Sequence, residues 1–154
     1  MPREHSYRAN VVWTGAAHGS TKTYAAYSRD YTIFFDGKPV LAGSADPAFR
    51  GAASRYNPEE LLLGSLAACH MLAYLALCAR EGIAVVAYRD EASGTMSETA
   101  GAGRFTSVRL APQVTVDDAR LERALALHDV AREECFIANS VNFPVEHTPH
   151  IERA

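Results

Sequence analysis

Cysteine is scarce in this sequence: among 154 residues there are only three, Cys69, Cys78 and Cys135. Their spacing matches neither a zinc site nor the disulfide framework of a small secreted domain. A glycine-rich phosphate loop between a predicted strand and a predicted helix is also missing, so a nucleotide cofactor is not supported. We therefore expect no metal and no other cofactor.

The sequence has no excess of either charge, because 15 basic residues face 18 acidic ones and the formal net charge is −3. Without a basic surface, we expect no nucleic acid and no acidic membrane as a partner. Residues 1–10 lack the apolar segment of a secretory signal, which predicts a cytoplasmic protein with reduced thiols. In that compartment a cysteine pair is more often catalytic than structural.

One long apolar segment organises the chain. Residues 61–79 carry no charged side chain, and the sequence around them has the start and stop signals of a helix. The start signals are a capping residue, a proline at the first helical position and two acids in the first turn, namely Asn57, Pro58, Glu59 and Glu60. The stop signals are Arg80 and Gly82. A buried central helix is predicted over residues 57–81.

The same segment is long enough to cross a bilayer, which takes roughly 17 to 25 apolar residues. Small and polar residues such as Gly64, Ser65 and His70 favour instead a core helix of a globular protein or of a dimer. The small side chains of Gly64, Ala67 and Ala68 would let a second backbone come close. We expect no membrane-spanning role.

Segments with alternating apolar residues, or rich in aromatic and β-branched residues, predict strands on both sides of this helix. These strands span residues 7–13, 23–28, 31–37, 83–98, 104–116 and 144–151. Asp36 and Gly37 indicate a hairpin tip, and residues 43–56 a loop. Pro112 indicates an edge strand or a bulge.

A second helix is predicted over residues 119–135, with Asp117 or Asp118 as its cap. Its inward face would carry Leu121, Ala124, His128, Ala131 and Cys135. The order of strands, long helix, strands, helix and strand favours an α+β fold with both helices packed on antiparallel sheets. The length suits a single domain over residues 1–154.

Cys69 and Cys78 lie nine residues apart, on opposite faces of the long helix, and cannot pair with each other. If Cys69 has a disulfide partner within the chain, that partner is therefore Cys135. Cys78 is then a small apolar core residue. The simplest alternative is that all three cysteines only fill the core.

A nucleophilic Cys69 would need a nearby cation, because it lies about three turns into the helix, where the helix dipole has faded. The nearest arginines in the sequence are Arg50 and Arg55, and Glu59 or Glu60 could orient one of them. A rise of about 15 Å separates Glu59 from Cys69, so the two would meet only across a twofold dimer. The alternatives are a solvated loop and a helix-start charge.

The histidines give weaker signals. His70 follows Cys69 directly and lies about 100° around the helix from it, so the two are poor metal co-ligands. His128, on the inward face of the second helix, is either a half-buried residue or a base for Cys69 in a cysteine hydrolase. His147 and His150 are expected at an exposed strand end.

Two segments carry the most specific pattern: NPEELLLGSLAACH (57–70) and HDVAREECFIANSV (128–141). With the element order, they resemble the OsmC/Ohr family of thiol-dependent peroxidases, and more closely its OsmC side. The resemblance extends over nearly the whole chain. It implies an OsmC-like intertwined α+β homodimer.

The resemblance also implies roles for individual residues. Cys69 would be the thiolate that attacks the peroxide, and Cys135 the thiol that resolves the resulting sulfenic acid as a Cys69–Cys135 disulfide. Glu59 matches the glutamate of the family, and Arg50 is the best match to its arginine, with Arg55 in reserve. A dithiol, of the lipoyl type that the family suggests, would be the reductant.

Apolar residues near Cys69 are expected to favour organic hydroperoxides over hydrogen peroxide. The predicted lining residues of this pocket are Leu66, Leu72 and Tyr74. A non-enzymatic dimer that binds a small apolar molecule, or senses oxidation, in the same pocket is the alternative.

Overall fold

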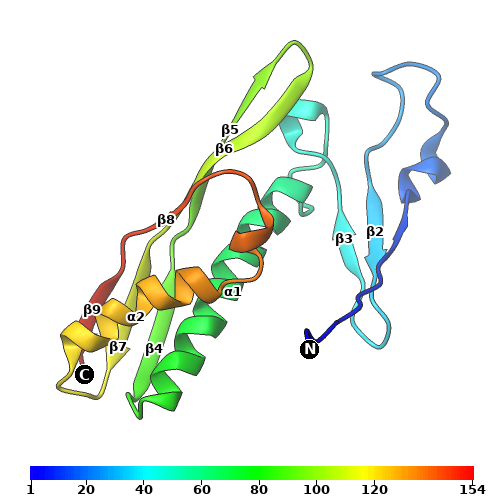
Figure 1. The fold of residues 1–154 in the computed structure, drawn as a ribbon. Helices are drawn as coiled ribbons and strands as arrows, with labels where there is room; N and C mark the ends of the chain where they lie inside the picture. The colour runs from blue at the N-terminus through cyan, green and yellow to red at the C-terminus, as the bar shows by residue number, and fades with distance from the viewer. The chain divides into compact units, whose positions relative to one another are not determined.

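The computed structural model describes all 154 residues, which form two compact units, residues 1–61 and 62–154. Two α-helices and three small sheets make up the chain (Figure 1). The α+β class predicted from the order of elements is confirmed. The single domain over residues 1–154 stays a prediction.

The unit of residues 1–61 contains one antiparallel sheet. Its strands are, in order, β1 (Asn10–Val12), β2 (Tyr31–Phe34) and β3 (Leu41–Gly43). The predicted hairpin tip between β2 and β3 is confirmed, with Gly37 in the left-handed region at a φ of 70°. Two 3-10 helices, η1 (Thr14–His18) and η2 (Pro47–Phe49), lie in the connecting segments.

Two strand predictions for this unit are wrong. Residues 23–28 form turns and bends, because the carbonyl groups of Tyr24 and Tyr27 accept hydrogen bonds from Arg29 rather than from a neighbouring strand. The half-buried strand predicted over residues 7–13 is reduced to β1, whose residues are all exposed.

The unit of residues 62–154 contains two three-stranded sheets. One has the order β4 (Val85–Asp90), β7 (Pro112–Val116), β9 (His150–Arg153), and the other β5 (Ser93–Thr99), β6 (Ala102–Leu110), β8 (Val145–His147). In each sheet the first pair is antiparallel and the second parallel, so the sheets are mixed rather than purely antiparallel. Each long strand predicted here is divided between the two sheets.

Pro112 marks one of these divisions. The edge or bulge predicted for it is wrong, because β7 is the middle strand of its sheet. Pro112 is the first residue of β7, a position that tolerates a residue without an N–H group. β6 ends at Leu110 and β7 begins at Pro112, so the proline lies at the boundary between two strands of different sheets.

The predicted long helix is confirmed as α1 (Pro58–Arg80). The side-chain oxygen of Asn57 accepts the backbone N–H of Glu60 at 2.8 Å, and the Glu60 carboxylate accepts the backbone N–H of Asn57 at 3.2 Å. This reciprocal pair is a capping box, which satisfies two N–H groups at the helix start.

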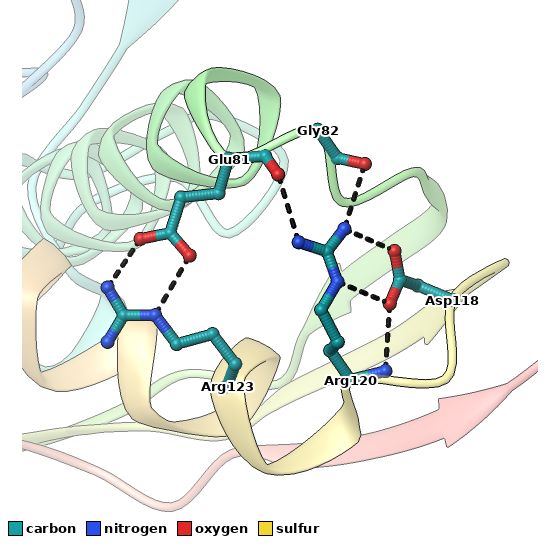
Figure 2. Close-up of polar contacts among 5 residues, drawn as sticks. All are labelled: Glu81, Gly82, Asp118, Arg120 and Arg123. Carbon is teal, nitrogen blue, oxygen red and sulfur yellow. Dashed lines mark hydrogen bonds and ion pairs between the residues drawn. The ribbon is translucent and has the colours of Figure 1, made fainter.

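The other end of α1 is joined to the start of α2 (Leu121–Glu134), as Figure 2 shows. Gly82, with a φ of 68°, supplies the left-handed residue after the helix. Arg120 donates to the carbonyl groups of Glu81 and Gly82 at 3.1 Å each, and pairs with the Asp118 carboxylate. Arg123 pairs with the side chain of Glu81. The cap predicted at Asp117 or Asp118 is wrong, because the N-cap residue of α2 is Arg120 and it has no side-chain cap bond. Asp118 accepts the backbone N–H of Arg120 itself, at 2.8 Å.

The core of this unit is made by one stripe of α1. Its buried residues, four apart, are Leu66, His70, Tyr74 and Cys78. Tyr74 and Cys78 pack with β7 and α2, which confirms Cys78 as a core residue, whereas Leu66 packs with β6 and β8. Both helices therefore cover sheet residues, as the α+β prediction requires.

The rest of α1 is poorly covered. An 18-residue window of the helix has a mean hydropathy of 1.9, and 22% of its residues are buried. By length and composition alone the helix could span a membrane, a test that core helices of soluble proteins also pass. Gly64, Ala68 and Leu72 are exposed, and a Cβ atom added to Gly64 would meet nothing within 4 Å.

Candidate functional site

Two of the predicted site residues, Cys69 and Cys135, come together in the unit of residues 62–154. Cys69 lies in the middle of α1 and is partly exposed, whereas Cys135 directly follows α2 and is 1% exposed. Both thiols are free, and Cys69 packs against the core cluster that contains Cys135, close enough for its thiol to raise the pKa of the Cys135 thiol. The inward direction predicted for Cys135 is confirmed.

The two thiols differ in their exposure to solvent. Burial raises the pKa of the Cys135 thiol, the backbone N–H of Ala138 opposes this shift, and the contact with Cys69 adds to it. Cys135 is therefore a protonated thiol at neutral pH, because an ordinary cysteine already titrates at about 8.5. A reagent in solution reaches Cys69 first.

A second group of predicted site residues lies in the unit of residues 1–61, around a pocket of about 510 Å³. The walls combine aromatic side chains with one arginine and two carboxylates. The residues concerned are Trp13, Tyr27, Tyr31, Phe49, Arg29, Asp46 and Glu59. A pocket of this kind suits a small molecule with an apolar body and a polar group.

Arg29 is the arginine of this pocket. Its guanidinium lies 3.7 Å from the ring centroid of Tyr27 and 4.7 Å from that of Tyr24, and donates to the backbone carbonyl groups of both residues. These partners hold the planar group without neutralising it, and Arg29 has no salt bridge. Its charge is available to an anion.

Glu59 lines the same pocket from the first turn of α1. Its Oε2 atom is buried and has no hydrogen-bond partner. Burial, and then the charge of Glu59, raise the pKa of Tyr31, which donates to the carbonyl oxygen of Tyr56 at 3.3 Å. A buried carboxylate oxygen without a hydrogen-bond partner is costly, so this atom is available to accept a donor in the pocket.

The two arginines chosen from the sequence lie elsewhere. Arg50 is exposed and has a left-handed backbone with a φ of 65°, and its side chain donates only to the carbonyl oxygen of Ala25, at 3.5 Å. Arg55 forms a salt bridge with Asp30 at 3.4 Å. Neither lines the pocket that holds Glu59.

Sequence reasoning missed Arg29, although a signal was present. Two tyrosines, five and two residues earlier, supply the rings on which its guanidinium lies. The same tyrosines were attributed to a strand over residues 23–28, because aromatic residues are also common in sheets.

The predicted apolar lining near Cys69 is wrong for two of three residues. Leu66 and Tyr74 are fully buried in the core and cannot line an open pocket, whereas Leu72 is 62% exposed. Closeness in sequence to Cys69 does not decide exposure here, because Leu66 and Tyr74 belong to the buried stripe of α1.

The histidines form a buried group rather than an exposed one. His70 Nε2 and His128 Nδ1 are 3.0 Å apart, and both side chains are 0% exposed. His147, predicted to be exposed, is half-buried and hydrogen-bonded to Asp129 at 2.8 Å, with its ring centroid 5.5 Å from that of His70. His150 is exposed in β9, as predicted.

The environment keeps the buried pair neutral. Burial, and to a smaller extent the neighbouring histidines, lower the pKa of His70 to about 4 and that of His128 to about 3. His128 contacts His70 through Nδ1, and its Nε2 atom is buried without a hydrogen-bond partner, so neither nitrogen is hydrogen-bonded to Cys69 as a cysteine hydrolase would require. The structure contains no group of three or more His, Cys, Asp or Glu side chains arranged to hold a metal ion.

The chain belongs to the OsmC-like protein family, whose model matches residues 51–150. A solved OsmC-like protein of unknown function from Vibrio cholerae is 30% identical; the alignment covers 96% of this chain and 100% of that one, with a TM-score of 0.84. No curated protein matches the chain.

Two further solved structures have the same fold. An organic hydroperoxide resistance protein from Elizabethkingia anophelis is 18% identical, with both chains covered completely and a TM-score of 0.72. One from Legionella pneumophila is 18% identical, with 98% of this chain and 99% of that chain covered and a TM-score of 0.66. Membership of the OsmC/Ohr family is consistent with a peroxide-related redox function.

Proposed function

We propose that the protein is a thiol-dependent peroxidase that reduces organic hydroperoxides with Cys69 and Cys135. The contact between these two free thiols, one partly exposed and one buried, carries the proposal. Two cysteines that only filled the core would give no reason for one of them to face solvent.

In the first step the Cys69 thiolate attacks the terminal oxygen of the hydroperoxide. An S–O bond forms and the O–O bond breaks, which leaves a sulfenic acid on Cys69 and an alkoxide that takes up a proton to become the alcohol. In the second step the Cys135 thiol attacks the sulfenic sulfur. A disulfide forms, and the hydroxyl group leaves with the thiol proton as water.

A cation is needed to favour the thiolate and to stabilise the departing alkoxide. We assign this role to Arg29, with Glu59 as the carboxylate that orients it, because both line one pocket. The assignment to Arg50, or to Arg55 in reserve, remains a sequence-based prediction. Experiments can compare the three arginines directly.

The proposal includes a homodimer in which the pocket of one chain faces Cys69 of the partner chain. The exposed stripe of Gly64, Ala68 and Leu72 on α1 supports this arrangement, because small residues let a second helix approach closely. No apolar side chain of residues 1–61 is fully buried, so that unit also has apolar surface to cover.

The pocket walls support organic hydroperoxides as substrates. The aromatic side chains of Trp13, Tyr27 and Phe49 offer apolar contact that hydrogen peroxide cannot use. A small dithiol of the lipoyl type is the proposed reductant, because it can exchange with a disulfide of which one sulfur is partly exposed.

Steady-state turnover tests this proposal. With dihydrolipoamide as the reductant, wild-type protein should reduce cumene hydroperoxide faster than hydrogen peroxide. Cys69→Ser should abolish turnover, Cys135→Ser should strongly reduce it, and Cys78→Ser, a core control, should retain it. Equal activity of Cys69→Ser and wild type would rule out the mechanism. Faster use of hydrogen peroxide would contradict the role of the aromatic pocket.

The same pocket supports a second candidate, a non-enzymatic dimer that binds a small apolar molecule or senses oxidation. Its volume of about 510 Å³ is within the usual range of ligand sites. A binding protein would show saturable ligand binding with no hydroperoxide turnover. An oxidation sensor would form the disulfide once, without efficient recycling by the dithiol.

A further inference from the structure

A buried histidine pair joins the two helices that carry the thiols. His70 belongs to α1 and His128 to α2, and their ring nitrogens Nε2 and Nδ1 are 3.0 Å apart. The rings are stacked with an interplanar angle of 12°, and the Tyr74 ring lies against His128 with a centroid distance of 3.8 Å. The hydrogen bond and the packing of the rings therefore fix both the distance and the orientation of His70 relative to His128.

The pair is close to both thiols along the chain. His70 directly follows Cys69 in α1. His128 lies seven residues before Cys135, which places the two on nearly the same face of α2 and its C-terminal cap, about two turns apart. A slide or rotation of one helix against the other would change the histidine contact and the thiol contact together.

Stability alone does not explain this pair. The outer nitrogens, His70 Nδ1 and His128 Nε2, are both buried without a hydrogen-bond partner. In a neutral pair one ring donates and the other accepts, so either choice of tautomers leaves one donor and one acceptor unsatisfied. Two apolar side chains of similar volume would avoid that cost.

The other ionisable groups around the pair do not replace its hydrogen bond. His147 of β8 lies near both rings, with centroids 5.5 and 6.4 Å away, but its Nε2 is bonded to Asp129. The remaining groups are Tyr74 of α1, Tyr88 of β4 and Arg132 of α2. Arg132 is bonded to the Val145 carbonyl group and to Asn139.

We propose that His70 and His128 are positioning residues for the disulfide step, which hold α1 and α2 in the register that brings Cys69 to Cys135. The inference rests on the proposed function, since it assigns the pair to its second step. That step joins the two sulfurs and releases water. It requires the sulfurs to meet in line, so its rate depends on how often the helices hold this register.

The test separates register from stability. In the double variant His70→Leu/His128→Leu, both buried polar partners are removed together, so we expect a melting temperature equal to or above that of the wild type. We expect the sulfenic acid of Cys69 to form at the wild-type rate but to condense with Cys135 at least about tenfold more slowly, as small misplacements in oriented reactions cost this much or more. Stopped-flow tryptophan fluorescence and sulfenic acid trapping distinguish the two steps.

Conservative variants provide the rescue. Glutamine places a polar atom near the position of a histidine Nε2, and asparagine near that of Nδ1. His70→Gln/His128→Asn should therefore restore most of the condensation rate, whereas His70→Gln/His128→Leu should not. Tyr88→Phe is the matched control. It removes a buried hydroxyl group that also has no hydrogen-bond partner, and we expect it to leave the condensation rate unchanged.

A second readout does not depend on peroxidase activity. Diamide oxidises dithiols directly, so disulfide formation can be followed even if no hydroperoxide reacts. Slower diamide-driven closure in the double leucine variant supports the inference, and closure at the wild-type rate overturns it. If wild-type protein closes with diamide but not with hydroperoxide, the proposed function fails while the positioning role stands. If the double leucine variant does not fold, His70→Gln/His128→Asn is compared with His70→Gln/His128→Leu. Faster disulfide formation in the Gln/Asn variant supports the inference, and equal rates overturn it.

Discussion

The two units of the chain differ sharply in how they bury apolar residues. All fully buried apolar side chains of the core belong to residues 62–154, where two clusters join α1, α2 and the sheets. In residues 1–61, large apolar side chains are exposed instead. They include Tyr7, Val11, Val12, Trp13, Tyr24, Phe34, Phe35, Val40 and Tyr56.

The candidate site residues are divided between the same two units. Residues 62–154 hold a thiol pair, and residues 1–61 hold Arg29 and Glu59 around an open pocket. The unit of residues 62–154 has a core of its own, whereas the unit of residues 1–61 has no fully buried apolar side chain. In the proposed dimer, a partner chain covers the unit of residues 1–61, and catalysis depends on both units.

The largest effect is expected when a charge is introduced into the exposed stripe of α1, where the proposed dimer forms. Ala68→Glu would place a charge where the proposed dimer brings two helices together, so we expect monomers and a loss of turnover of about 10³-fold or more, because the thiol would lose the whole pocket of the partner chain, its arginine included. Light scattering after size exclusion and the cumene hydroperoxide assay measure the two effects. Leu125→Glu, on the exposed face of α2, is the control and should remain dimeric and active. A fully active monomer would show that one chain suffices.

The next test compares the arginines. Arg29→Gln should slow oxidation of Cys69 by about 10²-fold, because one preorganised charge next to the reacting atoms is lost. Arg50→Gln and Arg55→Gln should stay within about twofold of the wild type, since neither lines the pocket. Single-turnover oxidation of Cys69 in a Cys135→Ser background gives the rate. A larger loss for Arg50→Gln would restore the sequence-based assignment.

The smallest effect concerns acid stability of the unit of residues 62–154. His70 and His128 have lowered pKa values in the folded chain, so the unfolded chain binds more protons below about pH 6.5. Their contribution to the free energy of unfolding is complete above that pH and is lost as the pH falls toward 4. The loss reaches up to about 2.7 kcal/mol per pH unit while both are protonated only in the unfolded chain.

Urea unfolding at pH 7 and pH 5 measures this difference. The double leucine variant has no histidine at either position and should lose less stability over the same interval. An equal loss in both proteins would mean that other groups control the acid response.

Local signals predicted much of the fold. The cap at Asn57 and the stop signals Arg80 and Gly82 predicted both ends of α1, because they act within one helical turn. The inward face of α2, including Cys135, followed from helical spacing. The division of each long strand between two sheets was missed, since a bend that moves a strand between sheets leaves alternation of side chains almost unchanged.

The candidate site was predictable where the partners lie on regular elements. Cys135 was predicted as the partner of Cys69 because Cys78 lies on the opposite face of the same helix and because the family resemblance implies the pair. Arg29 was missed because it lies in an irregular segment, where contacts with the Tyr24 and Tyr27 carbonyl groups depend on tertiary structure. The His70–His128 contact was missed for a similar reason: each helix pattern predicts burial but not which buried side chain meets which.

The most direct test of the peroxidase account is a thiol titration in a single turnover. One equivalent of cumene hydroperoxide per chain, without added reductant, should remove two of the three free thiols, and peptide mass spectrometry should find Cys69 linked to Cys135 while Cys78 stays free. No loss of thiols, or a disulfide that excludes Cys69, would contradict the account.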